Sequence, residues 1–117
     1  MNAGPEINEN NSSTARSKDS ERLRAVLTSH HDDLRDIAAK YRAHDIHIFG
    51  SVARGDAEAG SDIDLLVSID GPDYEQLMST LGMADELTER LGVRVDVVAR
   101  GIAPNLADVT PTVEISL

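Results

Sequence analysis

The chain contains no cysteine among its 117 residues, so it can form neither a disulfide nor a thiolate metal site. It also lacks any apolar run near the roughly 20 residues that span a bilayer, and its N-terminus has no apolar signal-peptide core. These absences favour a cytoplasmic protein without membrane contact. A chain of this length can bury one hydrophobic core without disulfides, which indicates a single domain.

Basic residues are scarce relative to acidic ones. The chain has 11 Lys and Arg against 21 Asp and Glu, a formal net charge of −10. Proteins that hold nucleic acid rely on lysine and arginine facing phosphates, so direct binding to nucleic acid is not expected. Solubility alone explains this charge at least as well as a basic partner or a need to concentrate divalent cations.

The N-terminal segment 1–19 is rich in Asn, Ser and Glu and has one isolated Ile, a composition typical of a disordered tail. From Ser20 the apolar residues recur at three- and four-residue spacing, with Asp19 or Ser20 as the helix N-cap. This pattern predicts one long helix, or two helices that break near His30. We therefore expect residues 20–117 to form the single folded domain.

The four histidines are not expected to carry chemistry. His30 falls on the apolar stripe of the first helical region, where a partly buried packing histidine is more common than a ligand. The other three histidines have no further ligand-type residues at the spacing of a metal site in the sequence; they are His31, His44 and His47.

Strand and helix patterns alternate after this region. Residues 46–49 predict a short strand that ends at Gly50, and a short helical piece and a polar loop follow over 51–61. Residues 63–69 predict a strand with its odd positions apolar, so that Asp62 and Asp64 point to the opposite face. A helix follows, with an apolar stripe of Leu77, Leu81, Ala84, Leu87 and Leu91 that ends before Gly92. Residues 93–98 predict a strand in which Asp96 points away from the face of Val93, Val95 and Val97. One helical turn is expected between Pro104 and Pro111.

This alternation predicts an α/β (α+β) fold, a small mixed sheet flanked by helices. Three carboxylates, Asp62, Asp64 and Asp96, would then share one face, where they repel each other unless a cation neutralises them. Oxygen ligands of this kind favour Mg²⁺ or Mn²⁺ over Zn²⁺. The alternative is that Asp62 caps a strand and Asp64 simply faces solvent, because an isolated Asp-x-Asp is common.

The segment before these aspartates strengthens the interpretation of a divalent-cation site, because it is suited to bind a phosphate. Gly50 permits close backbone approach, and the Ser51 hydroxyl with the first N–H groups of a helix suits a phosphate. Arg54 lies one turn further on and could add positive charge at the same anion. An ion pair from Arg54 to Asp56 or Glu58 is nearly as good an explanation of that arginine.

These residues resemble a known family. Gly50-Ser51, ten residues and then Asp62-Ile63-Asp64 match the Gly-Ser-x10-Asp-x-Asp motif of the DNA polymerase β nucleotidyltransferase superfamily. The longer strings, residues 49–55 and 61–67, resemble the minimal nucleotidyltransferases (MNT), antitoxins paired with HEPN-domain ribonuclease toxins. The resemblance runs from about Leu23 to Val98 and implies a polymerase-β-like nucleotidyltransferase palm.

The resemblance also implies a role for each motif residue. Gly50 and Ser51 would hold the β- and γ-phosphates of ATP, the nucleotide donor. Asp62 and Asp64 would bind two Mg²⁺ ions, and Asp96 would hold the catalytic ion and help to deprotonate the attacking hydroxyl. The implied activity is transfer of AMP to a tyrosine of the HEPN toxin, with which the chain could form a hetero-oligomer.

Two alternatives remain open at this point. The chain could neutralise its partner by complex formation alone, although its three intact carboxylates argue against a decayed site. It could instead be a toxin that adds nucleotides to tRNA ends, although superfamily relatives that do so are usually larger and more basic.

Overall fold

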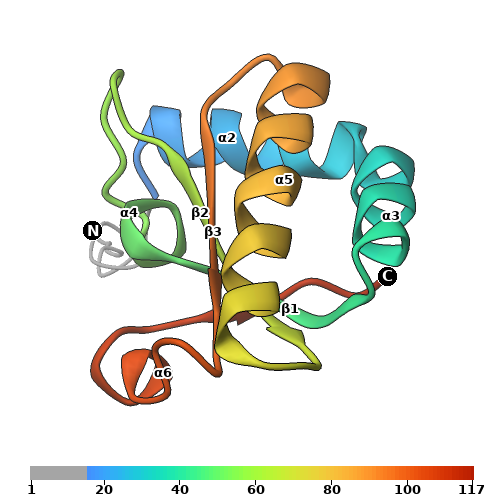
Figure 1. The fold of residues 1–117 in the computed structure, drawn as a ribbon. Helices are drawn as coiled ribbons and strands as arrows, with labels where there is room; N and C mark the ends of the chain where they lie inside the picture. Colours follow the sequence, from blue (N-terminus) through green and yellow to red (C-terminus); the bar gives the residue numbers. More distant parts are fainter. Residues whose placement is uncertain (1–15) are drawn as a thin grey trace, which may run out of the picture.

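A four-stranded sheet of order β3-β2-β1-β4 organises residues 16–117, the part of the chain that the structure, a computed structural model, describes (Figure 1). The elements, in chain order, are α2 (Lys18–Ser29), α3 (His31–Lys40), β1 (Ala43–Phe49), α4 (Gly50–Arg54), β2 (Ile63–Ile69), α5 (Asp73–Leu91), β3 (Val95–Ala99), α6 (Leu106–Val109) and β4 (Val113–Glu114). Strand β2 pairs in parallel with β3 and antiparallel with β1, and β1 also pairs antiparallel with β4. The expected mixed α/β fold is confirmed.

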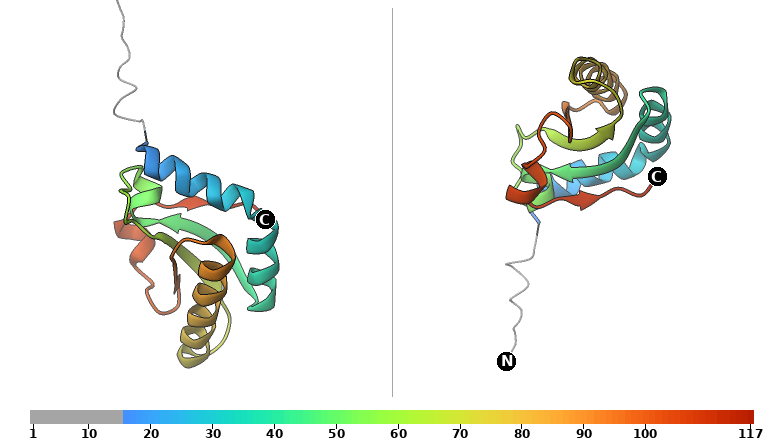
Figure 2. Two further views of the ribbon diagram at one scale, coloured as in Figure 1. Left: turned by 90° about the horizontal axis from the view of Figure 1, so that it is seen from above. Right: turned by 60° about the horizontal axis from the view of Figure 1, so that its bottom comes forward.

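One face of the sheet carries the hydrophobic core. The odd positions of β2 are buried there, and Ile63, Leu65 and Val67 are fully so. They form a single cluster with core residues of three helices, namely Leu23 and Leu27 of α2, Leu34 and Ile37 of α3, and Met83, Leu87 and Leu91 of α5. Helix α3 lies beside α5, as both views of Figure 2 show. The opposite side, here called the carboxylate face, carries Asp64 and Asp96, as the alternation in β2 predicts.

The first helical region is divided into two helices, α2 and α3, which meet at His30. The N-cap of α2 is Ser17, so the prediction of Asp19 or Ser20 was wrong: Ser17 has an extended backbone and its side chain accepts from the backbone N–H of Ser20. Residues 16–19 therefore belong to the folded part. The rest of the predicted disordered tail, residues 1–15, lies outside the described residues.

Strand β4 is an element that the sequence pattern does not predict. It follows Pro111 and adds only two residues to the sheet, where Val113 pairs with Ile48 and Glu114 pairs with His47. Strand β1 is also three residues longer at its start than predicted, and β3 is displaced toward the C-terminus. Within residues 16–117, no helix is both long and apolar enough to cross a bilayer.

The predicted core stripe of α5 is correct in its second half and wrong in its first half. Leu87 and Leu91 are buried, whereas Leu77 and Leu81 are 48% and 53% exposed. The row that continues inward from Leu87 consists instead of Met83, Thr80 and Gln76. Both rows have helical spacing, so periodicity cannot choose between them; the packing of the second half decides which row faces the sheet.

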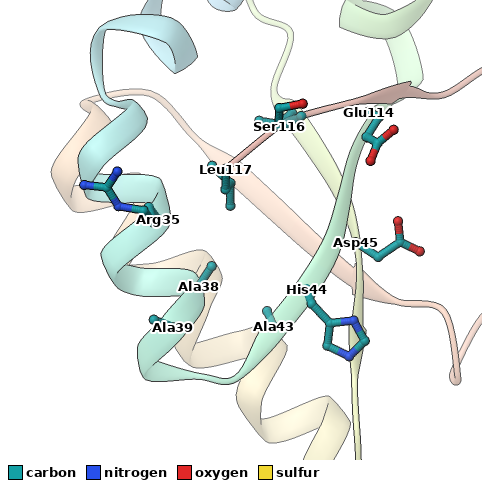
Figure 3. Close-up of a pocket in the computed structure, with 10 residues that line it drawn as sticks. Arg35, Ala38, Ala39, Ala43, His44, Asp45, Glu114, Ser116 and Leu117 are labelled. Carbon is teal, nitrogen blue, oxygen red and sulfur yellow. The ribbon is translucent and has the colours of Figure 1, made fainter.

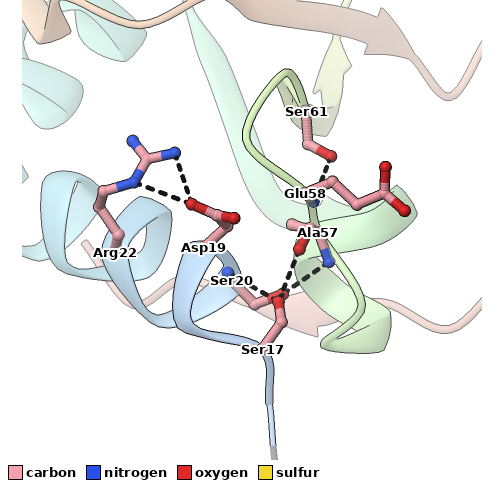
Figure 4. A network of polar contacts seen from close by, with 7 residues as sticks. All are labelled: Ser17, Asp19, Ser20, Arg22, Ala57, Glu58 and Ser61. Atoms are coloured by element: carbon pink, nitrogen blue, oxygen red, sulfur yellow. Dashed lines mark hydrogen bonds and ion pairs between the residues drawn. The ribbon is translucent and has the colours of Figure 1, made fainter.

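A buried hydroxyl network joins the start of α2 to the loop after α4 (Figure 4). Ser20 is fully buried, and its Oγ accepts from the backbone N–H of Ala57 at 2.9 Å. Ser17 Oγ lies 2.8 Å from Ser20 Oγ and 2.7 Å from the carbonyl oxygen of Ala57. The network fixes the loop that leads from α4 to Asp62 and the start of β2.

Replacing Ser20 with alanine should lower the free energy of unfolding by about 1–3 kcal/mol, because the buried N–H of Ala57 loses its acceptor. Ser29→Ala is the matched control, since Ser29 is exposed and only donates to the preceding turn of its own helix. Urea denaturation at neutral pH measures both. Equal stabilities for the two variants would contradict a structural role for the network.

Candidate active site

Register in the sheet brings three of the predicted site residues together. Asp64 of β2 is the direct partner of Asp96 of β3, which places their Cα atoms about 4.8 Å apart. On its other side Asp64 pairs with Phe49, the residue before Gly50. A Cβ built on Gly50 would collide with Asp64 Oδ2, so the backbone of Gly50 lies directly against that carboxylate. Gly50 also has a positive φ of 73°, which glycine adopts without strain.

Asp62 reaches the same group through an arginine that was not predicted as a site residue. Arg94 Nε lies 3.6 Å from Asp62 Oδ2, and its Nη2 lies 3.5 Å from Asp96 Oδ1. The arginine thus spans two of the three carboxylates, with its side chain 70% exposed to solvent. Arg94 precedes Asp96 by two residues, so the period of a strand places both on one face and could have identified it.

Asp64 has the most perturbed carboxyl group of the three. Burial raises its pKa to about 6, and the nearby charges of Asp96 and then Asp62 add to this rise, while Arg54 opposes it. Desolvation and like charges both penalise the ionised form of a carboxyl group. Asp64 is therefore a half-buried carboxyl group beside two like charges, and Arg54 offsets only part of the rise in its pKa.

The two remaining predicted residues lie on α4. Ser51 follows Gly50 and is half-buried, and its carbonyl oxygen accepts from the backbone N–H groups of Gly55 and Asp56. Arg54 forms an ion pair with Asp56, with 3.3 Å between Nε and Oδ2. This is one of the two salt bridges considered as alternatives to phosphate binding, and both side chains of the pair are exposed. The arginine is still close enough to lower the pKa of Asp64.

A second group of ligand-type side chains lies further along the sheet. Atoms of Asp45, His47 and Glu114 lie within 4.8 Å of one another, although no chemistry was expected of His47. This cluster already has partners: Arg100 pairs with Asp45 at 3.5 Å, and Thr112 Oγ1 lies 3.1 Å from His47 Nδ1. It is separate from Asp62, Asp64 and Asp96, which do not meet the same 4.8 Å distance between ligand atoms. Arg94 lies between two of those aspartates, Asp62 and Asp96.

One surface hollow in the described residues also lies away from the aspartates. It has a volume of about 570 Å³ and is lined by α3, the start of β1 and the last residues of the chain, Glu114 to Leu117 (Figure 3). None of the six predicted site residues lines it. This hollow is therefore separate from the candidate active site on the carboxylate face.

The donor set of the three aspartates fits a divalent cation. Asp62, Asp64 and Asp96 offer only carboxylate oxygens, the ligands that Mg²⁺ prefers. Burial raises the pKa of Asp64 most and repulsion from Asp96 and Asp62 adds to the rise; a bound cation would oppose both effects. Arg94 supplies only one positive charge, from a flexible and exposed side chain.

Comparison with known proteins shows the family to which the chain belongs. The family model described as "Nucleotidyltransferase domain" matches residues 31–116. The protein adenylyltransferase MntA of Thermococcus cleftensis is 32% identical over 80 residues, 68% of this chain and 76% of that protein. A Methanocaldococcus jannaschii protein provisionally named a protein adenylyltransferase is 36% identical over 84 residues, 71% of this chain and 80% of the relative.

Two solved structures are similar as well. One, provisionally described as a minimal nucleotidyltransferase, has 36% sequence identity and a TM-score of 0.60, and the match covers 84% of this chain and 95% of that one. The other, a toxin-antitoxin with AMP-PNP, shares the fold at 20% identity and a TM-score of 0.56, over 71% of this chain and 69% of that one. The chain belongs to the nucleotidyltransferase domain family, fits its minimal MNT branch, and is a nucleotidyltransferase.

The raised pKa of Asp64 makes stability depend on pH. Between about pH 4 and pH 6 the folded protein keeps a proton that the unfolded chain has lost, so the free energy of unfolding falls as pH rises through this window. In EDTA, Asp64→Asn should therefore be more stable than the parent chain by about 1–2 kcal/mol at pH 7.5, after allowance for partial exposure. The two should converge below pH 4.

Urea titrations at several pH values measure this difference, with Asp108→Asn as the exposed control. Added Mg²⁺ should raise the stability of the parent chain and leave Asp64→Asn unchanged, because a ligand stabilises only the state that binds it. A constant difference between the proteins across pH would contradict the assigned burial and charge of Asp64.

Gly50→Ala tests the close approach of the backbone to Asp64. The new Cβ must displace the Asp64 carboxylate, and the alanine must adopt the positive φ of residue 50. We therefore expect the free energy of unfolding to fall by about 1–2 kcal/mol and the Mg²⁺-dependent stabilisation to be lost. Gly60→Ala is the matched control, because Gly60 has an ordinary φ and no other atom lies within 4 Å of the position that its Cβ would take. Melting with and without Mg²⁺ compares them, and retained Mg²⁺ stabilisation in Gly50→Ala would count against the site.

Proposed function

We propose that this nucleotidyltransferase is an antitoxin that acts in the cytoplasm. It would transfer AMP from ATP to a hydroxyl group, a tyrosine side chain, of a cognate HEPN-domain ribonuclease toxin and so neutralise it. The names of two relatives support transfer of an adenylyl group to protein. The resemblance of the Gly-Ser and Asp-x-Asp motif to minimal nucleotidyltransferases supports the toxin as acceptor.

One observation carries the chemical part of the proposal. Asp64 lies between the backbone of Gly50 and the carboxylate of Asp96, and its pKa is raised by burial and by both neighbouring aspartates. A triphosphate bound against Gly50 would therefore lie next to the carboxylates of Asp64 and Asp96 and be repelled by them. Such an arrangement is unfavourable for an anionic substrate unless divalent cations bind between the two.

The proposed roles of the carboxylates come from the resemblance to minimal nucleotidyltransferases, and the pairing of Asp64 with Asp96 supports them. Asp62 and Asp64 would hold two Mg²⁺ ions, and Asp64 with Asp96 would hold the one nearer the reacting atoms. When bound, the ions stabilise the charge that develops on the α-phosphate and on the leaving oxygen. Asp96, on β3 and half-exposed, would accept the proton of an incoming hydroxyl group.

The backbone and side chain of the Gly-Ser pair would bind the triphosphate. Gly50 leaves room beside Asp64, and Ser51 contributes a hydroxyl donor to the β- and γ-phosphates. The hydroxyl oxygen of the acceptor then attacks the α-phosphorus in line. As that bond forms, the bond to the bridging oxygen breaks and pyrophosphate leaves. Arg54 could reach the same phosphates only by leaving Asp56.

The charge of the chain favours a protein as acceptor. With a formal charge of −10, the surface would repel a nucleic acid backbone and reduce its affinity. A protein acceptor can bring its own basic residues and its own binding surface to a small domain. Its complex with the chain would also place one hydroxyl group at the open carboxylate face.

The proposed activity is tested by labelling a co-purified partner with ATP radiolabelled at the α-phosphate. Asp62→Ala and Asp64→Ala should each lower the rate of Mg²⁺-dependent labelling of the partner by at least about a hundredfold, because the cation that stabilises the developing negative charge is no longer held. Asp108→Ala, an exposed aspartate of α6, should label at the parental rate. The label should be stable to hydroxylamine and located on tyrosine by mass spectrometry.

The same assay separates the alternatives. If Asp64→Ala still rescues growth from the toxin and no modification is detected, neutralisation depends on complex formation alone. If labelled nucleotide enters tRNA without a protein partner, the acceptor is RNA. Either result would replace the proposed reaction.

A further inference from the structure

The first half of α5 exposes a continuous apolar row to solvent. Four side chains make up this row, which we call the α5 outer face: Tyr74, Leu77, Met78 and Leu81, exposed by 72%, 48%, 50% and 53%. Their spacing of three and four residues places them on one side of the helix. Single exposed apolar residues are ordinary, whereas a row on one helix marks a contact surface.

The inward side of the same half-helix is polar where a core helix is normally apolar. Gln76 and Thr80 are 8% and 4% exposed, and Thr80 donates to the carbonyl oxygen of Leu77. Gln76 donates to the carbonyl oxygen of Gly71, while its Oε1 is buried with no hydrogen-bond partner among the described residues. The packing of Met83, Leu87 and Leu91 fixes the rotation of the helix. The apolar residues of its first half therefore remain exposed on the outer side.

Acidic side chains surround the α5 outer face. Asp73 and Glu75 flank its first turn, and Asp85 and Glu89 continue the same side of the helix beyond Leu81; all four are exposed. The basic residue of the last turn, Arg90, pairs with Asp33 at 2.8 Å on another side. A second copy of this chain would bring the same carboxylates together, and an anionic membrane would be repelled as well.

We propose that the α5 outer face docks a different protein, through an apolar surface edged by lysine or arginine side chains. Apolar contact would supply affinity, and the carboxylates around it would select a basic partner and exclude self-association. The four residues are outside the predicted active site, so this inference does not depend on the transfer reaction. The docking surface would leave the carboxylate face free.

The test uses a fluorescent synthetic peptide of leucine and lysine, about 18 residues long and amphipathic when helical, as a probe of this chemistry. Its binding to the full chain is followed by anisotropy at low and at high salt. Leu77→Ser/Leu81→Ser should weaken binding at least about tenfold, because two partly exposed leucines lose their apolar contact. Val109→Ser is the matched control, since Val109 is 78% exposed on α6.

Two further probes and one further measurement decide the outcome. A leucine-glutamate peptide of the same pattern and a scrambled leucine-lysine peptide should both bind at least about tenfold more weakly. Equal binding of either probe, or an unchanged affinity in Leu77→Ser/Leu81→Ser, would overturn the proposal. The proposal would also be overturned if sedimentation showed that the parent chain is a dimer and that Leu77→Ser/Leu81→Ser is a monomer. Urea titration should give the double variant parental stability, because neither leucine belongs to the core.

Discussion

The parallel pairing of β2 with β3 is the constraint on which the candidate active site depends. It makes Asp64 and Asp96 direct neighbours and, together with the antiparallel partner β1, presses the backbone of Gly50 against the same carboxylate. Two carboxyl groups at this spacing repel, and burial of one of them increases the cost. The rest of the fold has to supply the stability that this arrangement removes.

That stability comes from the opposite face of the same strands. The apolar odd positions of β2 lie in one cluster with α2, α3 and α5, while Asp64, at an even position, faces the other side of the sheet. A substitution that shifted the register by one residue would exchange the two faces and lose both. The hydroxyl network of Ser17 and Ser20 adds a second constraint, because it fixes the loop that enters β2.

Features governed by local spacing could be predicted from the sequence. The two faces of β2 follow from a short-range pattern, whereas the helical pattern left open whether the chain breaks near His30. The grouping of the glycine with the aspartates follows from the motif that the chain shares with nucleotidyltransferases. Features that depend on distant contacts could not: β4 is defined by its pairing with β1, and the exposed Leu77 and Leu81 follow from how the second half of α5 packs. Arg94 was within reach, since it shares a strand face with Asp96.

The central claim is that Asp62, Asp64 and Asp96 form the divalent-cation site of this nucleotidyltransferase. The most direct measurement is an anomalous difference map from a crystal soaked with Mn²⁺ and a non-hydrolysable ATP analogue. The account predicts peaks between these aspartates, with the Arg94 side chain displaced from Asp62 and Asp96 and the triphosphate against Gly50 and Ser51. A peak confined to the cluster of Asp45, His47 and Glu114, with Arg94 still in place, would contradict it.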